Sequence, residues 1–248
     1  MATDLEVIAG TSTTTAIVPA HAGFFKADPR LRSLAALNAS AVSGSGAASA
    51  SSGFTYGREV FLSTLATGRA AYVYGLPGTV GFNVSLANRN QIDFSKKVWM
   101  AGYVSFGATV GGTAYMGDAN TMCRITLGGY SSATTGDMTL RGIGLKKVGG
   151  VGSFVTLTVH NGTALTDVAT TVAVADTAGI NWVIYSDGTG NVTLYINGVQ
   201  AATTTAGPTS ATGSTAGCYR EQVEATATPG VRQAMNIGAG GGWLYLEG

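Results

Sequence analysis

The strongest constraint on the fold is a stretch in which β-forming runs alternate with tight glycine turns. Residues 182–186 (Trp-Val-Ile-Tyr-Ser) lead into the turn 187–190 (Asp-Gly-Thr-Gly), and residues 192–196 (Val-Thr-Leu-Tyr-Ile) lead into Asn197-Gly198. Asn-Gly supplies the two positive φ angles of a type I′ turn, which joins adjacent antiparallel strands. The stretch therefore predicts a β-hairpin over 182–196 and a further strand after residue 198.

The side chains of this hairpin alternate, so one face of each strand is buried and the other is wet. The residues that share a face are Val183 with Tyr185, and Val192 with Leu194 and Ile196. Antiparallel strands with one apolar face need a second layer to cover that face. Trp182 is expected to fill the space between the two layers.

Strand signals dominate the chain from about residue 53 onward, and long helical periodicity is absent. An Asn161-Gly162 turn follows one of these runs. The predicted runs are 98–106, 124–127, 138–143, 154–160, 235–238 and 243–246. This pattern predicts an all-β fold, a two-sheet antiparallel sandwich of the jelly-roll kind over 53–248.

The first 52 residues form a different kind of segment. Leu31, Leu34 and Leu37 recur at a spacing of three after Pro29, which predicts a short helix over 29–38. Residues 40–52 contain only Ser, Ala, Gly and one Val, a composition of a flexible linker or an extended arm. We therefore expect an N-terminal arm over 1–52 in front of the sandwich.

Composition excludes several classes of protein. Charged residues make up 11% of the chain and the net charge is +1, so no basic field is present to gather nucleic acid. No apolar run reaches the roughly 18 residues of a membrane helix, and no secretory signal is recognised near residues 5–9. We expect a protein made in the cytoplasm. Cys123 and Cys218 either pair or remain buried thiols.

Three segments carry a resemblance to a known family. They are Ile92-Asp93-Phe94-Ser95 leading into 98–106, Trp182 with its strand, and the hairpin 187–199 that ends in Asn-Gly. Together they resemble the concanavalin-A-like lectin/glucanase superfamily, in particular its laminin-G and pentraxin-like branch. The resemblance covers about 53–246 and implies a concanavalin-A-like jelly roll.

The glucanases of that superfamily carry a Glu-x-Asp-x-x-Glu strand, whose alternate carboxylates act as nucleophile and acid. None of the five glutamates here lies two residues before an aspartate. Glu221 and Glu224 are three residues apart, which on a strand sends them to opposite faces. We expect no enzyme activity, and His160 is expected to be solvated or to cap its turn.

The sequence contains candidate residues for two kinds of ligand, a sugar and a calcium ion. Sugar binding needs exposed aromatic rings, for which Tyr130, Tyr219 and Trp243 are the candidates, although core packing is the alternative for Trp243. The resemblance also implies that calcium is a candidate ligand, while no other cofactor is expected. The residues that would coordinate calcium are Asp118, Asn120, Asp187 and Asn191. For all four, a turn-stabilising role is the favoured alternative.

These features support two functional hypotheses. The first is a structural protein of a virus particle, such as a bacteriophage capsid-decoration, tail or fibre protein, located in the virion. It would act by assembly contacts of the sandwich and the arm with other virion proteins and with copies of itself. The alternative is a carbohydrate-binding, lectin-like module that recognises glycans.

Overall fold

The computed structural model describes thirteen segments of the chain, and all further statements concern these residues. They are 31–33, 40–44, 48–54, 57–62, 65–68, 70–75, 92–110, 113–130, 135–150, 152–174, 178–212, 219–238 and 243–246. Their regular structure consists of β-strands, and every strand pairing among them is antiparallel. None of these residues forms a helix that could span a membrane.

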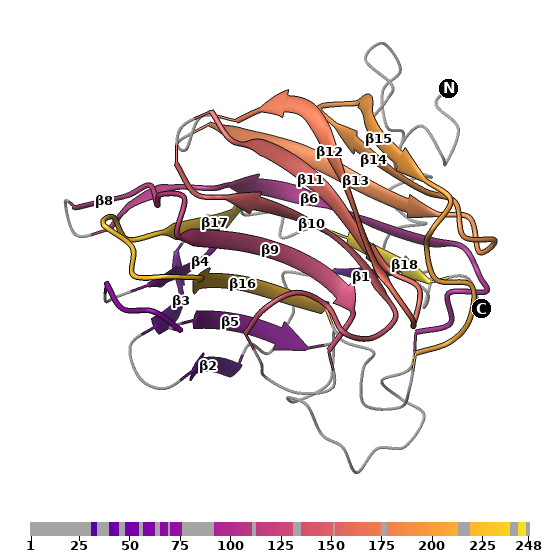
Figure 1. The fold of residues 1–248 in the computed structure, drawn as a ribbon, viewed down its shortest axis with the longest axis horizontal. Coiled ribbons are helices and arrows are strands. Elements are labelled where there is room, and N and C mark those ends of the chain that lie inside the picture. The colour runs from indigo at the N-terminus through magenta and orange to yellow at the C-terminus, as the bar shows by residue number, and fades with distance from the viewer. Residues whose placement is uncertain are drawn as a thin grey trace.

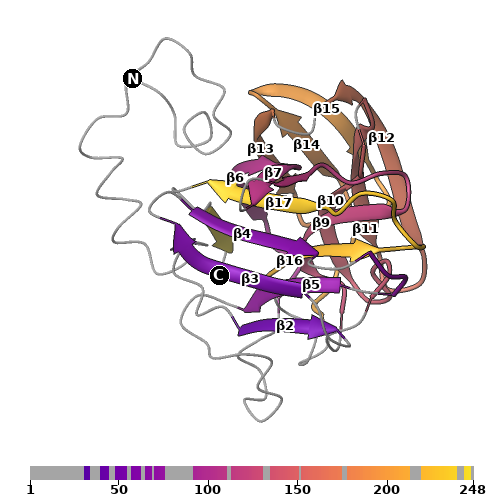
Figure 2. The same ribbon diagram turned by 90° about the vertical axis from the view of Figure 1, so that its left-hand side faces the viewer.

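The described strands build two large sheets that face each other (Figures 1 and 2). The nine-stranded sheet follows the order β15 (Val199–Thr204), β14 (Val192–Ile196), β13 (Gly179–Ser186), β6 (Val98–Ser105), β17 (Ala234–Gly238), β4 (Gly57–Leu62) and β3 (Ala48–Phe54), with β18 (Trp243–Leu246) between β6 and β1 (Leu31–Ser33). The seven-stranded sheet follows the order β12 (Leu165–Ala173), β11 (Phe154–His160), β10 (Gly142–Val148), β9 (Thr121–Gly128), β16 (Tyr219–Ala225), β5 (Ala70–Gly75) and β2 (Ser40–Gly44). A small ribbon pairs β7 (Ala108–Val110) with β8 (Thr113–Tyr115). The predicted all-β antiparallel sandwich is confirmed.

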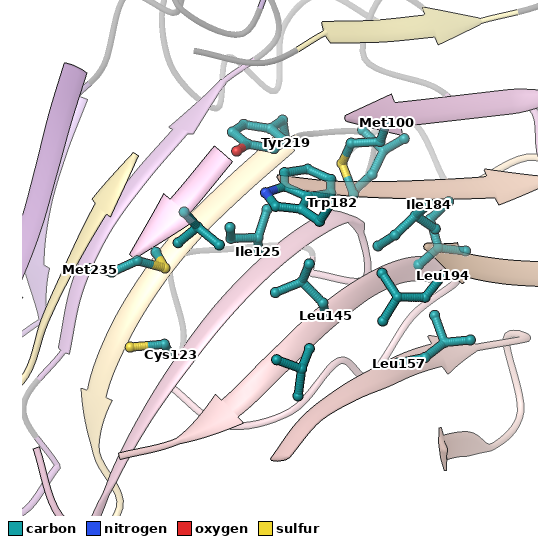
Figure 3. Packing of buried hydrophobic residues seen from close by; sticks show 14 of the residues in the cluster. Met100, Cys123, Ile125, Leu145, Leu157, Trp182, Ile184, Leu194, Tyr219 and Met235 are labelled. Atoms are coloured by element: carbon teal, nitrogen blue, oxygen red, sulfur yellow. The ribbon is translucent and has the colours of Figure 1, made fainter. Parts of the chain in front are cut away.

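The core lies between the sheets, where alternate residues of both layers meet. Trp182 of β13 is 1% exposed and packs in one cluster with Met100 of β6 and Leu145 of β10 (Figure 3). Its predicted position between the layers is therefore confirmed. Removing this much apolar surface from water is the main force that holds the two sheets together.

The hairpin predicted over residues 182–196 forms with the expected register. Ser186 pairs with Val192 and Trp182 pairs with Ile196 across β13 and β14. Asn197 (φ 51°) and Gly198 (φ 81°) supply the two left-handed positions of the next turn. The β11–β12 hairpin also forms, but its connection is the four-residue loop 161–164, stabilised by Asn161 rather than by a two-residue turn.

The predicted helix over 29–38 is wrong where the structure describes it. Residues 31–33 form strand β1, whose partners Trp243–Tyr245 lie more than 200 positions away in the chain. Pairing with β18 supplies backbone hydrogen bonds that outweigh a weak local spacing of leucines. The other residues of the predicted helix, 29, 30 and 34–38, lie outside the described residues.

For the stretch 40–52 the sequence favours either a flexible linker or an extended arm. Its described residues, 40–44 and 48–52, are extended. It contributes β2, which closes one edge of the seven-stranded sheet, and most of β3, which closes one edge of the nine-stranded sheet. The predicted boundary between residues 52 and 53 falls inside β3. A separate role for residues 1–52 stays a prediction.

The strand predicted over 138–143 also needs correction. The strand begins at Gly142, and residues 138–140 belong to the β9–β10 loop. Met138 is buried there, because its side chain lies against Gly129 and Gly142. Cys123 is buried in the core, while Cys218 lies outside the described residues, so their pairing stays open.

Candidate functional site

The outward face of the nine-stranded sheet carries three aromatic rings in one row. Trp99 of β6 pairs with Tyr185 of β13 on one side and with Tyr245 of β18 on the other. The described burial of their strand neighbours, Val98, Met100, Ile184, Ser186 and Leu244, shows that alternation turns these three rings away from the core. Ring centroids lie 4.9 Å apart for Trp99–Tyr185, which are stacked, and 5.0 Å apart for Trp99–Tyr245, which meet edge on. We call these three residues the aromatic row; each is partly exposed.

Polar groups border the aromatic row. Thr193 lies opposite Tyr185, and its hydroxyl is 3.3 Å from the hydroxyl of Thr203 on the next strand. Tyr103, which is 42% exposed, lies two residues beyond Ala101 on β6 and pairs with the exposed Asn181. Flat apolar rings beside hydroxyl and amide groups are the combination that a sugar, with apolar C–H faces and polar edges, can contact.

The outward face of the seven-stranded sheet carries charged side chains instead. Arg124 of β9 lies beside Lys146 of β10, and Asp137 from the β9–β10 loop reaches both. Arg124 also pairs with Glu224 at 2.6 Å, and Lys146 pairs with Asp167 at 2.6 Å. We call these five residues the charged cluster. They were not among the sequence candidates, because strands β9, β10, β12 and β16 and the β9–β10 loop bring them together from distant parts of the chain.

The charges of this cluster stabilise each other. Burial lowers the pKa of Arg124, but Glu224 and Asp137 raise it by more, so the pKa lies above its ordinary value. Burial raises the pKa of Asp137, but Arg124 and Lys146 outweigh that effect and leave its pKa below the ordinary value. Both groups are therefore ionised at neutral pH.

The β9–β10 loop (residues 129–141, described except for 131–134) closes over part of this face. Tyr130 donates to the carbonyl of Gly136 at 3.0 Å, and the Gly136 amide donates to Glu224 at 2.8 Å. The guanidinium carbon of Arg220 lies 4.1 Å from the centre of the Tyr130 ring. Burial is the main cause that raises the pKa of Tyr130 to about 12, so its hydroxyl remains a donor.

The predicted sugar-binding residues do not come together. Tyr130 belongs to the β9–β10 loop and is buried beneath its own loop at 1% exposure, and Tyr219 lies in the core, where its hydroxyl donates to Glu221 at 2.9 Å. Trp243 pairs with Ala101 in the sheet, and its side chain is not described. Sugar contact by these residues stays a prediction, although burial argues against Tyr130 and Tyr219 as exposed platforms.

The four predicted calcium ligands belong to two separate turns. Asp118 accepts from the amides of Asn120 at 2.9 Å and of Gly230 at 2.5 Å. Asp187 accepts from the side-chain amide of Asn191 at 2.6 Å and from the amide of Thr189 at 2.7 Å. Both aspartates therefore stabilise turns, as the alternative prediction states.

Within the described segments no group of three or more His, Cys, Asp or Glu side chains is placed to hold a metal ion. Burial raises the pKa of Asp187, but the hydrogen bonds from Asn191 and Thr189 lower it by more, so this pKa lies below its ordinary value. Its carboxylate is thus held ionised by the turn itself. Calcium binding stays a prediction.

The predicted separation of the two neighbouring glutamates agrees with the structure. Glu221 points into the core with Tyr219, whereas Glu224 points outward to Arg124. Two carboxylates on opposite faces of one strand cannot act together on one bond.

His160 caps the β11–β12 loop, as the sequence suggests. Its Nδ1 accepts from the Gly162 amide at 3.0 Å, and burial, together with the charge of Arg141, lowers its pKa. The folded state therefore resists a proton that the unfolded chain accepts, so stability falls as the pH drops from about 7.5 to about 5.5.

We expect this pH-dependent loss to be smaller in His160→Asn, because its Oδ1 can accept from Gly162 and does not titrate. Urea unfolding at both pH values measures the difference. An equal loss in wild type and variant would contradict this role of His160. The carboxylates with lowered pKa lose their contribution only below this window, at a pH near 4, so they do not obscure the comparison.

Comparison with known proteins supports the assignment of the fold but does not assign a function. No family model matches the chain, and no curated protein matches it. Among solved structures, "HCR/D-Sa-GBL1/C" is 12% identical with a TM-score of 0.50, and the match covers 84% of this chain and 43% of that one. The chain thus spans less than half the length of that protein. At this identity the likeness shows a shared fold alone.

Two further structures align less well. The binding domain of botulinum neurotoxin DC in complex with rat synaptotagmin II is 12% identical, with a TM-score of 0.47 and coverage of 84% of this chain and 43% of that one. The alginate lyase PA1167 from Pseudomonas aeruginosa is 8% identical, with a TM-score of 0.48 and coverage of 77% and 83%.

Proposed function

We propose that this chain is a lectin-like module that binds glycans through the aromatic row, without transforming them. The observation that carries the proposal is the row itself: three partly exposed rings in contact on the outward face of a sheet. The core does not need these rings, because Trp182, Phe94 and Phe106 already fill the space between the layers. Aromatic surface kept outside a core is typical of a binding surface.

The geometry of the row suits a sugar ring. The stacked Trp99 and Tyr185 offer apolar faces to the C–H groups of a pyranose, while the hydroxyls of Thr193 and Thr203 lie at its side. Rigid aromatic side chains lose little conformational entropy on binding, so modest contacts suffice for recognition.

Binding rather than hydrolysis is supported by the carboxylates. Glycoside hydrolysis requires two carboxyl groups on either side of one bond, and the glutamates of β16 face in opposite directions. The outward Glu224 is already engaged by Arg124 and by the Gly136 amide. We therefore propose a non-enzymatic function.

A glycan array tests this function. Wild type is expected to bind at least one glycan, and Trp99→Ala is expected to bind it at least about tenfold more weakly, since the stacking surface is lost. Val199→Ala is the matched control, because Val199 lies in the same sheet on β15 and is 69% exposed. Failure of the wild type to bind any glycan, or equal binding by Trp99→Ala, would contradict the proposal.

A second candidate is the structural protein of a virus particle, located in the virion. Its support is the placement of β2 and β3, which are made almost entirely of Ser, Ala and Gly and close one edge of each sheet. Such strands pair through the main chain with little demand on sequence, so equivalent strands can join copies of the chain or other virion proteins. Mass spectrometry of purified particles tests this candidate, and the absence of the chain from them would refute it.

A further inference from the structure

The charged cluster contains one carboxylate that comes from a loop rather than from a strand. One oxygen of Asp137 accepts from Nε and Nη2 of Arg124, at 3.1 Å and 3.0 Å, and from Nζ of Lys146 at 3.0 Å. The Asp137 side chain is 41% exposed, whereas that of Arg124 is 4% exposed. A carboxylate on the solvent side is thus held by two cations that are built into the sheet.

The two cations keep their positions without Asp137. Glu224 holds Arg124 at 2.6 Å from β16, and Asp167 holds Lys146 at 2.6 Å from β12. Both partners lie on strands of the same sheet. If the loop moves away, the two cations remain side by side on neighbouring strands, where a second carboxylate fits between them.

Unpartnered polar atoms lie on the same outward face. Thr126 lies two residues after Arg124 on β9, and Gln222 is the strand partner of Arg124 on β16. Both side chains are fully buried. In the described part of the chain, Oγ1 of Thr126 and Oε1 of Gln222 have no hydrogen-bond partner. Buried polar atoms without a partner are costly, and a polar ligand beside Arg124 would give these two atoms a partner.

The neighbouring surface is open and partly apolar. Lys146 pairs with Thr156 on β11, and Phe154, two residues before Thr156, is 52% exposed. Val148, two residues after Lys146 on β10, is 37% exposed. A ring attached to a carboxylate at the two cations would therefore find an exposed aromatic ring, that of Phe154, two residues along the neighbouring strand.

From this arrangement we propose that Arg124 and Lys146 form a subsite for the carboxylate of an acidic sugar, and that Asp137 occupies this subsite until such a glycan displaces it. The exposed ring of Phe154 next to a threonine hydroxyl favours a uronic-acid oligosaccharide over an acidic peptide. The subsite lies on the seven-stranded sheet and is independent of the aromatic row on the other sheet.

Calorimetric titration with a galacturonic-acid hexasaccharide tests this subsite. Asp137→Ala is expected to bind it at least about tenfold more tightly than wild type, because the competing carboxylate of the chain is removed. The gain should vanish in Asp137→Ala/Lys146→Met and persist in Asp137→Ala/Trp99→Ala. The last variant separates this subsite from the aromatic row, so the two proposals can fail independently.

Three controls make the result specific. Asp93→Ala removes an equally charged group whose carboxylate accepts from the amide and hydroxyl of Ser95 in its own turn, and this variant should bind the glycan as wild type does. A galactose hexasaccharide should show no gain with Asp137→Ala. Asp137→Asn, which keeps the size of the side chain, should show a gain if Asp137→Ala does not fold.

No gain with either Asp137 variant would overturn the proposal, as would a gain that survives the loss of Lys146. An equal gain for a glutamate-rich peptide would overturn the assignment to a glycan.

Discussion

Trp182→Ala is expected to lower the free energy of unfolding by about 3–5 kcal/mol, because it empties a large space between the two sheets. Trp182 is 1% exposed and contacts both layers of the core (Figure 3). Its Nε1 has no hydrogen-bond partner in the described residues, so no polar interaction is lost with the ring. Urea denaturation measures the change.

Trp182→Phe is the informative companion variant, since it keeps an aromatic ring and removes the unpaired donor. We expect it to cost clearly less than Trp182→Ala. Val199→Ala, at an exposed position of β15, should change stability by no more than about 0.5 kcal/mol. A loss below about 1 kcal/mol for Trp182→Ala would mean that the ring does not hold the layers together.

Arg124→Met is expected to cost about 3–5 kcal/mol, because it leaves the carboxylate of Glu224 buried without its guanidinium partner. The pair is 2.6 Å long, and each side chain is 4% exposed. Guanidinium chloride unfolding of the single variant measures this loss. A cost below about 1 kcal/mol would contradict the importance of this pair.

The double variant Arg124→Met/Glu224→Gln separates charge from packing. It should recover part of the stability, since a neutral amide is less costly to bury than a lone carboxylate. Gln at position 224 can still accept from the Gly136 amide, so the loop contact is retained. No recovery would indicate that Arg124 acts through packing rather than through its charge.

Local patterns are the part of this fold that can be predicted from the sequence. The hairpin of β13 and β14 is specified by alternation and by the glycine turn 187–190, all within 20 residues, and it forms as predicted. The alternation rule also places Glu221 inward and Glu224 outward. The expectation of no enzyme activity rests on the absence of the Glu-x-Asp-x-x-Glu motif from the sequence, and it stays a prediction.

Features that depend on distant pairing could not be predicted. The three residues of β1 take their conformation from β18, and the sequence near Leu31 contains no trace of that partner. Strand β16 (Tyr-Arg-Glu-Gln-Val-Glu-Ala) contains four polar residues in seven, one of which, Glu221, interrupts the inward apolar face, and all four are buried in the fold. Polar residues normally indicate an exposed segment, so this strand was not recognised.

The candidate site was hidden for a similar reason. Trp99, Tyr185 and Tyr245 lie in three strands that are far apart in the chain, and only the register of β6 with β13 and β18 places them in one row. Sugar binding was expected to need exposed aromatic rings, and that expectation stays a prediction. From the sequence, Tyr130 and Tyr219 were selected instead, and the loop and the core cover both of these rings.

The most direct test of the account is an NMR titration of the wild-type protein with the glycan that binds most tightly on the array. Binding through the aromatic row predicts that the indole signal of Trp99 and the amide signals of β6, β13 and β18 shift together and saturate with one affinity. Shifts confined to other strands, or no shift at saturating glycan, would contradict it.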